Sequence, residues 1–365
     1  MVDEATGEEN LLVKTEERNY DDEALLREFV QAYPNESIPD LSRWRRELLA
    51  YNRLLKYSFI DSPGQTNSFF TSPITNSKNE PLLDAEGKPR FDTVRMGVDR
   101  KFVRRTFSRG SLGYNGRLNG GWWQRTSEAK RTTIRIDDME TIEIDFSGMH
   151  PAILYAMKGV TPPEGDYYKL ESLFKNVTPQ AQRTALKLLV LVAINAKTTK
   201  KAFRAFSWSK GGRGIQRSYP HAELQQLLDA FCEKHPLIAD SLGADAGITC
   251  MRHDSNICMS VINYFTERKT PILSVHDSMI IRITETIPLR ERMLVAFHKE
   301  FPECRFEPKL VSADTGEDEL RHLEPIDRWG QLKHTPETPG YKKRFERFCV
   351  WKFPNGINRA SYEGT

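Results

Sequence analysis

Residues 271–283 read Pro-Ile-Leu-Ser-Val-His-Asp-Ser-Met-Ile-Ile-Arg-Ile, two apolar stretches that meet at His276, Asp277 and Ser278. Apolar runs of this length on either side of a short polar turn are typical of a β-hairpin. The turn places the Asp277 carboxylate at the tip of a buried hairpin. Removing that charge from water is costly unless a cation or hydrogen bonds compensate, so Asp277 is a candidate functional residue.

A second stretch, residues 131–147, has the same character. It contains two alternating, β-branched runs separated by Asp137-Asp138, which predicts two strands joined by a turn, and the second run ends in Asp145. Two carboxylates that end buried strands can converge on one sheet and hold a pair of Mg²⁺ ions, because hard cations prefer carboxylate oxygens. Taken singly, such aspartates are more often turn or cap residues.

The remaining segments are predicted to be mainly helical. Helical spacing of apolar residues runs from about 22 to 58, with interruptions at two prolines. Further helices are expected from His150-Pro151 onward and over 178–206, 221–243, 253–267 and 287–301, whereas residues 60–92 show no sustained period and are expected to be loop. Residues after 323 are expected to form a basic, aromatic tail or small appendage.

Composition excludes several classes of protein. The 365 residues are 39% apolar and 28% charged, which is typical of a globular chain, and no apolar run is long enough to cross a membrane. The five cysteines form no Cys-x-x-Cys pair, so neither a zinc site nor a disulfide framework is indicated. The acidic N-terminus does not resemble a signal peptide. We therefore expect a cytoplasmic protein that does not enter a membrane.

The net charge of +3 conceals a strongly uneven distribution. Residues 1–30 carry ten acids and three bases, residues 95–135 carry eleven bases and two acids, and residues 183–217 carry nine bases and no acid. Basic blocks of this kind indicate a polyanionic partner if they converge on one surface. Separate solvated faces are the alternative.

Two motifs within these blocks suggest how a polyanion would be bound. Arg183 and Lys187 are one helical turn apart in a segment whose other residues are almost all apolar, so both can grip a triphosphate. Arg117 lies in a glycine-flanked loop that can approach a nucleic-acid backbone closely. The nearby Trp122-Trp123 pair could stack on bases, although paired tryptophans more often belong to a core.

Together these segments resemble the family A polymerases, which include bacterial and phage repair-type DNA polymerases and phage-type single-subunit RNA polymerases. The matching motifs are Gly116-Arg117-Leu118 for the family's glycine-arginine-leucine loop, Asp145-Phe146-Ser147 for the first metal motif, Arg183-x₃-Lys187 for the fingers helix and Val275-His276-Asp277 for the second metal motif. Asp254-Ser255-Asn256-Ile257 is a weaker match to a helix that touches the primer–template minor groove. The resemblance covers roughly residues 110–300.

The resemblance implies an α+β fold with an antiparallel palm sheet, helical fingers and a reduced, helical, thumb-like N-terminal region, as expected of a phage or mobile element. The implied organisation is a disordered acidic N-terminus (1–20), the thumb-like region (21–109), the first half of the palm (110–160), the fingers (161–245), the second half of the palm (246–322) and the C-terminal extension (323–365). Because about 110 residues precede the first motif, we expect no proofreading exonuclease.

The resemblance also implies roles for individual residues. The catalytic, metal-binding residues would be Asp145 and Asp277, holding two Mg²⁺ ions, with Mn²⁺ as an alternative. The nucleotide-binding residues would be Arg183, Lys187, His150, Asn195 and Leu191, and the nucleic-acid-binding residues would be Arg117, His276, Ser255, Asn256 and Ser278. The implied partners are a DNA primer–template and dNTPs, with RNA and rNTPs as the alternative.

Three positions bear on the choice of sugar. His150, five residues after Asp145, is large, as in the family's DNA polymerases, whereas the RNA polymerases have glycine there. Asn195-Ala196 replaces the family's tyrosine-glycine pair, and Ser278 replaces the glutamate of the DNA polymerases. The leading hypothesis is a DNA polymerase. A primase or small RNA polymerase, a non-templated terminal transferase, a metal-dependent nuclease and an inactive nucleic-acid-binding protein are the alternatives.

Overall fold

The computed structural model describes residues 11–13, 22–34, 36–76, 80–97, 100–208, 219–312 and 335–354. The helices are α1 (Asp22–Ala32), α2 (Leu41–Lys56), α3 (Glu128–Arg131), α4 (Met149–Met157), α5 (Pro179–Ile194), α6 (Thr199–Trp208), α8 (His221–Lys234), α9 (Gly247–Glu267), α10 (Thr286–Glu300) and α12 (Pro339–Lys352). The strands are β1 (Leu11–Val13), β2 (Ile60–Asp61), β3 (Phe69–Pro73), β4 (Phe91–Arg95), β5 (Arg104–Ser108), β6 (Ser111–Asn119), β7 (Arg135–Ile136), β8 (Met139–Phe146), β9 (Ile272–Val275), β10 (Ser278–Arg282) and β11 (Leu310–Ser312). This mixture of helices and mainly antiparallel sheets confirms the predicted α+β class.

The central sheet has the strand order β2-β7-β8-β10-β9, and β11 also pairs with β8. All of these pairings are antiparallel. Both predicted strand pairs are confirmed, as the hairpins β7–β8 and β9–β10. The β7–β8 turn is made by Asp137 and Asp138, both with positive φ, which matches the twist that a two-residue hairpin turn needs.

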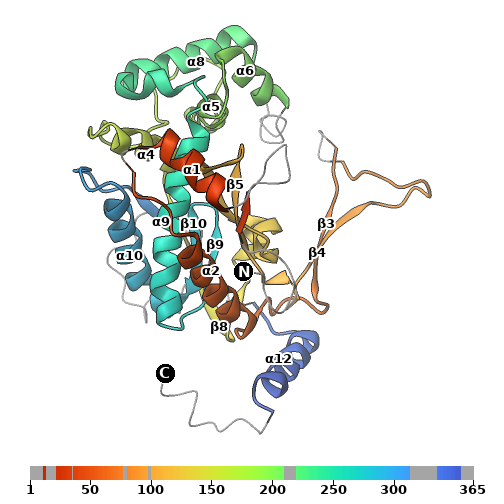
Figure 1. Ribbon diagram of the computed structural model, residues 1–365. Helices are drawn as coiled ribbons and strands as arrows, with labels where there is room; N and C mark the ends of the chain where they lie inside the picture. The colour runs from red at the N-terminus through yellow and green to blue at the C-terminus, as the bar shows by residue number, and fades with distance from the viewer. Residues whose placement is uncertain are drawn as a thin grey trace.

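The helices surround this sheet on several sides (Figure 1). The helix α9 contacts β6, α4, α10 and α2, and a continuous apolar core joins these elements to α5 and α8. In Figure 1, α5, α6 and α8 gather at one end of the molecule and α12 lies at the opposite end. No helix in the described ranges has both the length and the apolar character that crossing a bilayer requires.

Several predicted segments differ from the structure. Residues 60–92, expected to be loop, contain β2, β3 and part of β4, and β3–β4 projects from the body as a two-stranded ribbon (Figure 1). Its strands are short and mostly exposed, so they lack the alternation that identifies a half-buried strand. The predicted helix over 178–206 is broken between α5 and α6, and the one over 221–243 ends at Lys234, because Pro236 disfavours helical backbone at the residue before it.

The two ends of the chain are described only in part. Residues 11–13, expected to be disordered, form β1 and pair in parallel with β5, whereas residues 1–10 and 14–21 lie outside the described ranges. Within the expected C-terminal tail, residues 339–352 form α12, which packs on Phe59 through Tyr341 and Phe348. Residues 313–334 and 355–365 lie outside the described ranges.

A buried lysine beneath α12 leads to a prediction about stability. Lys101 is 4% exposed, and its Nζ donates to the carbonyl oxygens of Lys56 and Ser58 at 3.0 and 2.5 Å. Burial lowers the pKa of Lys101 to about 7, so between pH 7 and 9 the unfolded state binds more protons at this position. We expect the Lys101 contribution to raise the free energy of unfolding by about 2 kcal/mol across that window.

The measurement is urea unfolding of wild type and Lys101→Met at pH 7, 8 and 9. The difference between the two proteins matters, because the raised pKa of Asp145 described below acts in the opposite direction as the pH rises. The free energy of unfolding of wild type minus that of Lys101→Met should increase with pH. A difference that is constant from pH 7 to 9 would show that Lys101 does not titrate in this range.

Candidate active site

The register of the central sheet brings the two predicted aspartates together. Strands β8 and β10 pair so that Ser278 lies opposite Asp145, and Asp277 precedes Ser278 in the two-residue turn between β9 and β10. Both carboxylates are therefore at the same end of adjacent strands. The other turn residue, His276, is exposed and has a φ of 57°, a conformation that is costly for a residue other than glycine.

Asp145 is electrostatically strained in this position. Burial and the neighbouring charge of Asp277 raise the pKa of Asp145 to about 8, and the positive charge of Lys187 opposes this shift. The Asp145 Oδ1 atom is buried and has no hydrogen-bond partner among the described residues. A divalent cation would satisfy this oxygen and neutralise the repulsion, so the pair fits a hard metal ion.

The described part of the chain offers no larger metal cluster. Within it, no group of three or more His, Cys, Asp or Glu side chains is arranged to hold a metal ion. Glu143, two residues before Asp145, is engaged by the Arg131 guanidinium at 2.8 Å and accepts from Ser278 Oγ at 2.6 Å. The candidate metal ligands are therefore the two aspartates that the sequence indicates.

A third buried carboxylate, Asp254 on α9, lies beside this pair. Arg117 Nε on β6 donates to Asp254 Oδ2 at 2.6 Å, and Arg117 Nη2 lies 3.1 Å from His150 Nε2 on α4. Burial raises the pKa of Asp254, Arg117 opposes the shift, and the charge of Asp277 adds to it, which places Asp254 within electrostatic reach of Asp277. The chain Asp254–Arg117–His150 thus ties three elements together next to the carboxylate pair.

Asp254 and the internal partners of Arg117 were missed by the sequence analysis. Asp254 begins the weakest of the matched motifs, but only Ser255 and Asn256 were singled out there. Arg117 was predicted to contact nucleic acid. In the structure its guanidinium is hydrogen-bonded to Asp254 and His150. Its contact with nucleic acid stays a prediction.

His150 occupies the first turn of α4 and is 6% exposed. Burial and the adjacent charge of Arg117 lower the pKa of His150 to about 3, so the imidazole is neutral at pH 7 and Nε2 accepts a hydrogen bond from Arg117. Its buried Nδ1 has no partner in the part of the chain that the structure describes. The N-cap of α4 is Gly148, in the left-handed region at φ 69°, so His150 does not cap the helix.

The predicted nucleotide-binding residues on α5 share one face. Arg183, Lys187, Leu191 and the C-cap residue Asn195 follow one another at intervals of four and are exposed or half-buried, while Leu186 and Leu189 point into the core. Lys187 is exposed and forms no ion pair among the described residues, yet its charge acts on Asp145. Arg183 Nε instead donates to Asp166 Oδ2 at 2.5 Å, a partner that the sequence analysis missed.

Other predicted contacts are used inside the protein. The Arg105 guanidinium donates to Ser255 Oγ at 2.9 Å and to Asn256 Oδ1 at 2.5 Å, and Ser278 is 5% exposed. Their binding of nucleic acid stays a prediction. Trp122 and Trp123 are 2% and 0% exposed, so they belong to the core and cannot stack on bases.

Comparison with known proteins gives a limited result. No protein-family model matches the chain, and a search of curated proteins finds no match. Among solved structures, the chain is similar to the POL domain of Pol1 from M. smegmatis in complex with DNA primer-template and dNTP. The TM-score is 0.32 at 12% identity, and the match covers 63% of this chain and 48% of that one. A likeness of this extent carries no weight for function.

Proposed function

We propose that the protein is a nucleotidyltransferase that adds nucleotides to a 3′-hydroxyl, as a template-dependent DNA polymerase of the family A type. The observation that carries this proposal is the β8–β10 register, which sets Asp145 beside Asp277 with Lys187 in electrostatic reach. A metal-dependent nuclease would need the two aspartates but has no use for a cation projecting from an otherwise apolar helix.

Asp145 and Asp277 would hold two Mg²⁺ ions, or Mn²⁺ in their place, which when bound stabilise the attacking and leaving oxygens of a phosphoryl transfer. Lys187 would neutralise the triphosphate, because its charge acts on Asp145 and it forms no ion pair among the described residues. Arg183 would add a planar fork to the same phosphates once it leaves Asp166. Positioning and electrostatics then supply most of the catalysis.

His150 would stand against the sugar of the incoming nucleotide. Its ring is held from one side by Arg117, which is itself anchored on buried Asp254. A ring fixed in this way resists displacement by a 2′-hydroxyl better than a freely rotating side chain. This arrangement supports dNTPs as the preferred substrates.

The proposal predicts a change in sugar preference when His150 is truncated. His150→Ala and His150→Gly should raise the use of rNTPs relative to dNTPs by about 10-fold or more, because a steric block worth over 1 kcal/mol is removed. Arg117→Gln should raise it less, since the ring stays but is held more loosely. The measurement is kcat/KM for single-nucleotide addition with each sugar. Wild-type protein that extends as well with rNTPs would instead favour the primase or RNA polymerase alternative.

The direct test of function is a labelled primer incubated with Mg²⁺ and either dNTPs or rNTPs, with and without template. Template-dependent extension with dNTPs is the expected result. Extension without template would identify a terminal transferase, and shortening of the primer a nuclease. Binding without any reaction would identify an inactive nucleic-acid-binding protein.

A further inference from the structure

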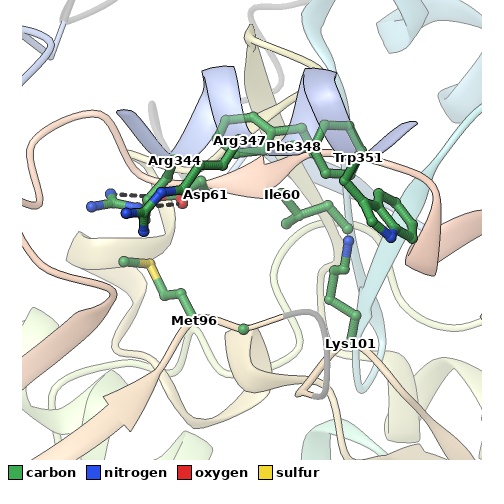
Figure 2. A pocket seen from close by; sticks show the side chains of 10 residues that line it. Ile60, Asp61, Met96, Lys101, Arg344, Arg347, Phe348 and Trp351 are labelled. Atoms are coloured by element: carbon green, nitrogen blue, oxygen red, sulfur yellow. Dashed lines mark hydrogen bonds and ion pairs between the residues drawn. The ribbon is translucent and has the colours of Figure 1, made fainter. Parts of the chain in front are cut away.

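A cavity of about 260 Å³ lies between α12 and the β2 edge of the central sheet (Figure 2). Its apolar walls are Phe59, Ile60, Met96 and Phe348, all of them buried, and Trp351 at 46% exposure stands at its mouth. We call this cavity the α12 pocket. Its volume lies just below the usual range for small-molecule sites, so it can enclose a single ring while the rest of a ligand stays outside.

The α12 pocket is held open by a firmly docked helix. Arg344 binds both carboxylate oxygens of Asp61 at 2.8 Å and also donates to the carbonyl oxygens of Thr66 and Gln65. The Tyr341 hydroxyl donates to Asp138 Oδ1 at 2.5 Å. These contacts fix α12 on the sheet edge. Because Arg344 is ion-paired with Asp61, its charge is not available to a ligand.

Two other basic side chains line the α12 pocket without an ion-pair partner among the described residues. Arg347 is exposed at the mouth, next to Arg344, and Lys101 stands on the opposite side near Trp351 (Figure 2). Lys101 Nζ donates two N–H groups to backbone carbonyls and lies 5.5 Å from the centre of the Phe348 ring. Its protonated form, which is about half of the population at pH 7, keeps a third N–H that these carbonyls do not use. A buried amine with a spare donor gains from an acceptor that enters the cavity.

The aromatic side chains provide flat surfaces beside these basic side chains. Trp351 stacks on Tyr57, with ring centroids 5.3 Å apart and an interplanar angle of 17°, and Phe348 forms the adjacent wall. An aromatic platform flanked by an exposed arginine is the chemistry that recognises a base together with its phosphate. A purely apolar ligand would offer no acceptor to either basic side chain.

We propose that the α12 pocket binds one nucleotide unit, with the base against Phe348 and Trp351, a base carbonyl accepting from Lys101, and the phosphate on Arg347. None of the residues that line it belongs to the Asp145–Asp277 site, so the inference does not rest on the proposed function. The same chemistry is presented by a free nucleotide and by a nucleotide within a single strand.

The test is calorimetric titration in EDTA with dTMP, thymidine, inorganic phosphate and a 5′-phosphorylated oligo(dT). We expect dTMP to bind more tightly than thymidine or phosphate, because only dTMP engages both halves of the pocket. Arg347→Gln should weaken binding of dTMP by about 10-fold, which is typical of a lost charge-assisted hydrogen bond. Lys343→Gln, on the same helix, exposed and outside the pocket, is the matched control and should change nothing.

The titration also distinguishes a free nucleotide from a single strand as the ligand, and the α12 pocket from the candidate active site as the place of binding. An oligonucleotide that binds at least as tightly as dTMP identifies a strand as the source, and one that binds far more weakly identifies the free nucleotide. Trp351→Leu should weaken binding in either case, with urea unfolding confirming that α12 stays docked. Binding retained in Lys187→Ala places the ligand away from the candidate active site. Binding that is unaffected by both Arg347→Gln and Trp351→Leu, or absent for every probe, overturns the proposal.

Discussion

Alanine in place of Asp145 or Asp277 is expected to reduce nucleotide incorporation below detection while leaving nucleic-acid binding largely intact. Each variant removes one of the two carboxylates that the β8–β10 register brings together, and with it the charge that would hold the metal ions. Binding should persist because it depends on the basic blocks around residues 95–135 and 183–217, whose phosphate contacts also make the affinity fall steeply with salt.

Two measurements decide this prediction. Primer extension should be lost in both variants, whereas Asp92→Ala, which removes an exposed carboxylate on β4, should extend normally. Asp145→Asn should in addition raise the free energy of unfolding at pH 9, since it removes a buried charge repelled by Asp277. Near-wild-type incorporation by either alanine variant would show that the two-metal interpretation is wrong.

The two hairpins were predictable because their signals are local. In β7–β8 and β9–β10 the apolar runs, the turn residues and the aspartates all lie within about a dozen residues of sequence. The spacing of apolar residues and the type of turn residue are therefore enough to predict both hairpins. The shared face of Arg183, Lys187, Leu191 and Asn195 follows from helical spacing alone. What the spacing leaves open is which of these side chains reaches the carboxylates.

The missed residues depend on contacts between distant segments. The Asp254–Arg117–His150 chain joins α9, β6 and α4, and nothing in the local sequence of Asp254 shows that its carboxylate is buried against an arginine. Asp166 likewise cannot be identified as the partner of Arg183 from the sequence, because the contact depends on the conformation of the loop before α5. The β3–β4 ribbon was missed because only one residue on each strand, Phe70 and Val94, is buried, so neither short strand shows an alternating pattern.

Alanine in place of Lys187 is expected to lower incorporation by two or more orders of magnitude. The ammonium acts on Asp145 and has no ion-pair partner among the described residues, so a triphosphate bound beside the carboxylates would lose its most available counter-charge. Removing one positioned electrostatic contact to the reacting group typically costs about 2.7–4 kcal/mol, and about 2.7 kcal/mol corresponds to a 100-fold change in rate. Alanine is the strongest helix former, so α5 should keep its structure.

Single-turnover kinetics with Lys187→Ala, Lys187→Arg and Lys201→Ala make this prediction sharp. Lys201 is exposed on the neighbouring helix α6 and serves as the control for loss of a positive charge in general. Lys187→Arg should recover part of the rate because it restores the charge with a different shape. If Lys187→Ala and Lys201→Ala behave alike, the cation on α5 is only part of a solvated basic face. The carboxylate pair would then have no triphosphate partner on that helix except Arg183, which Asp166 already holds.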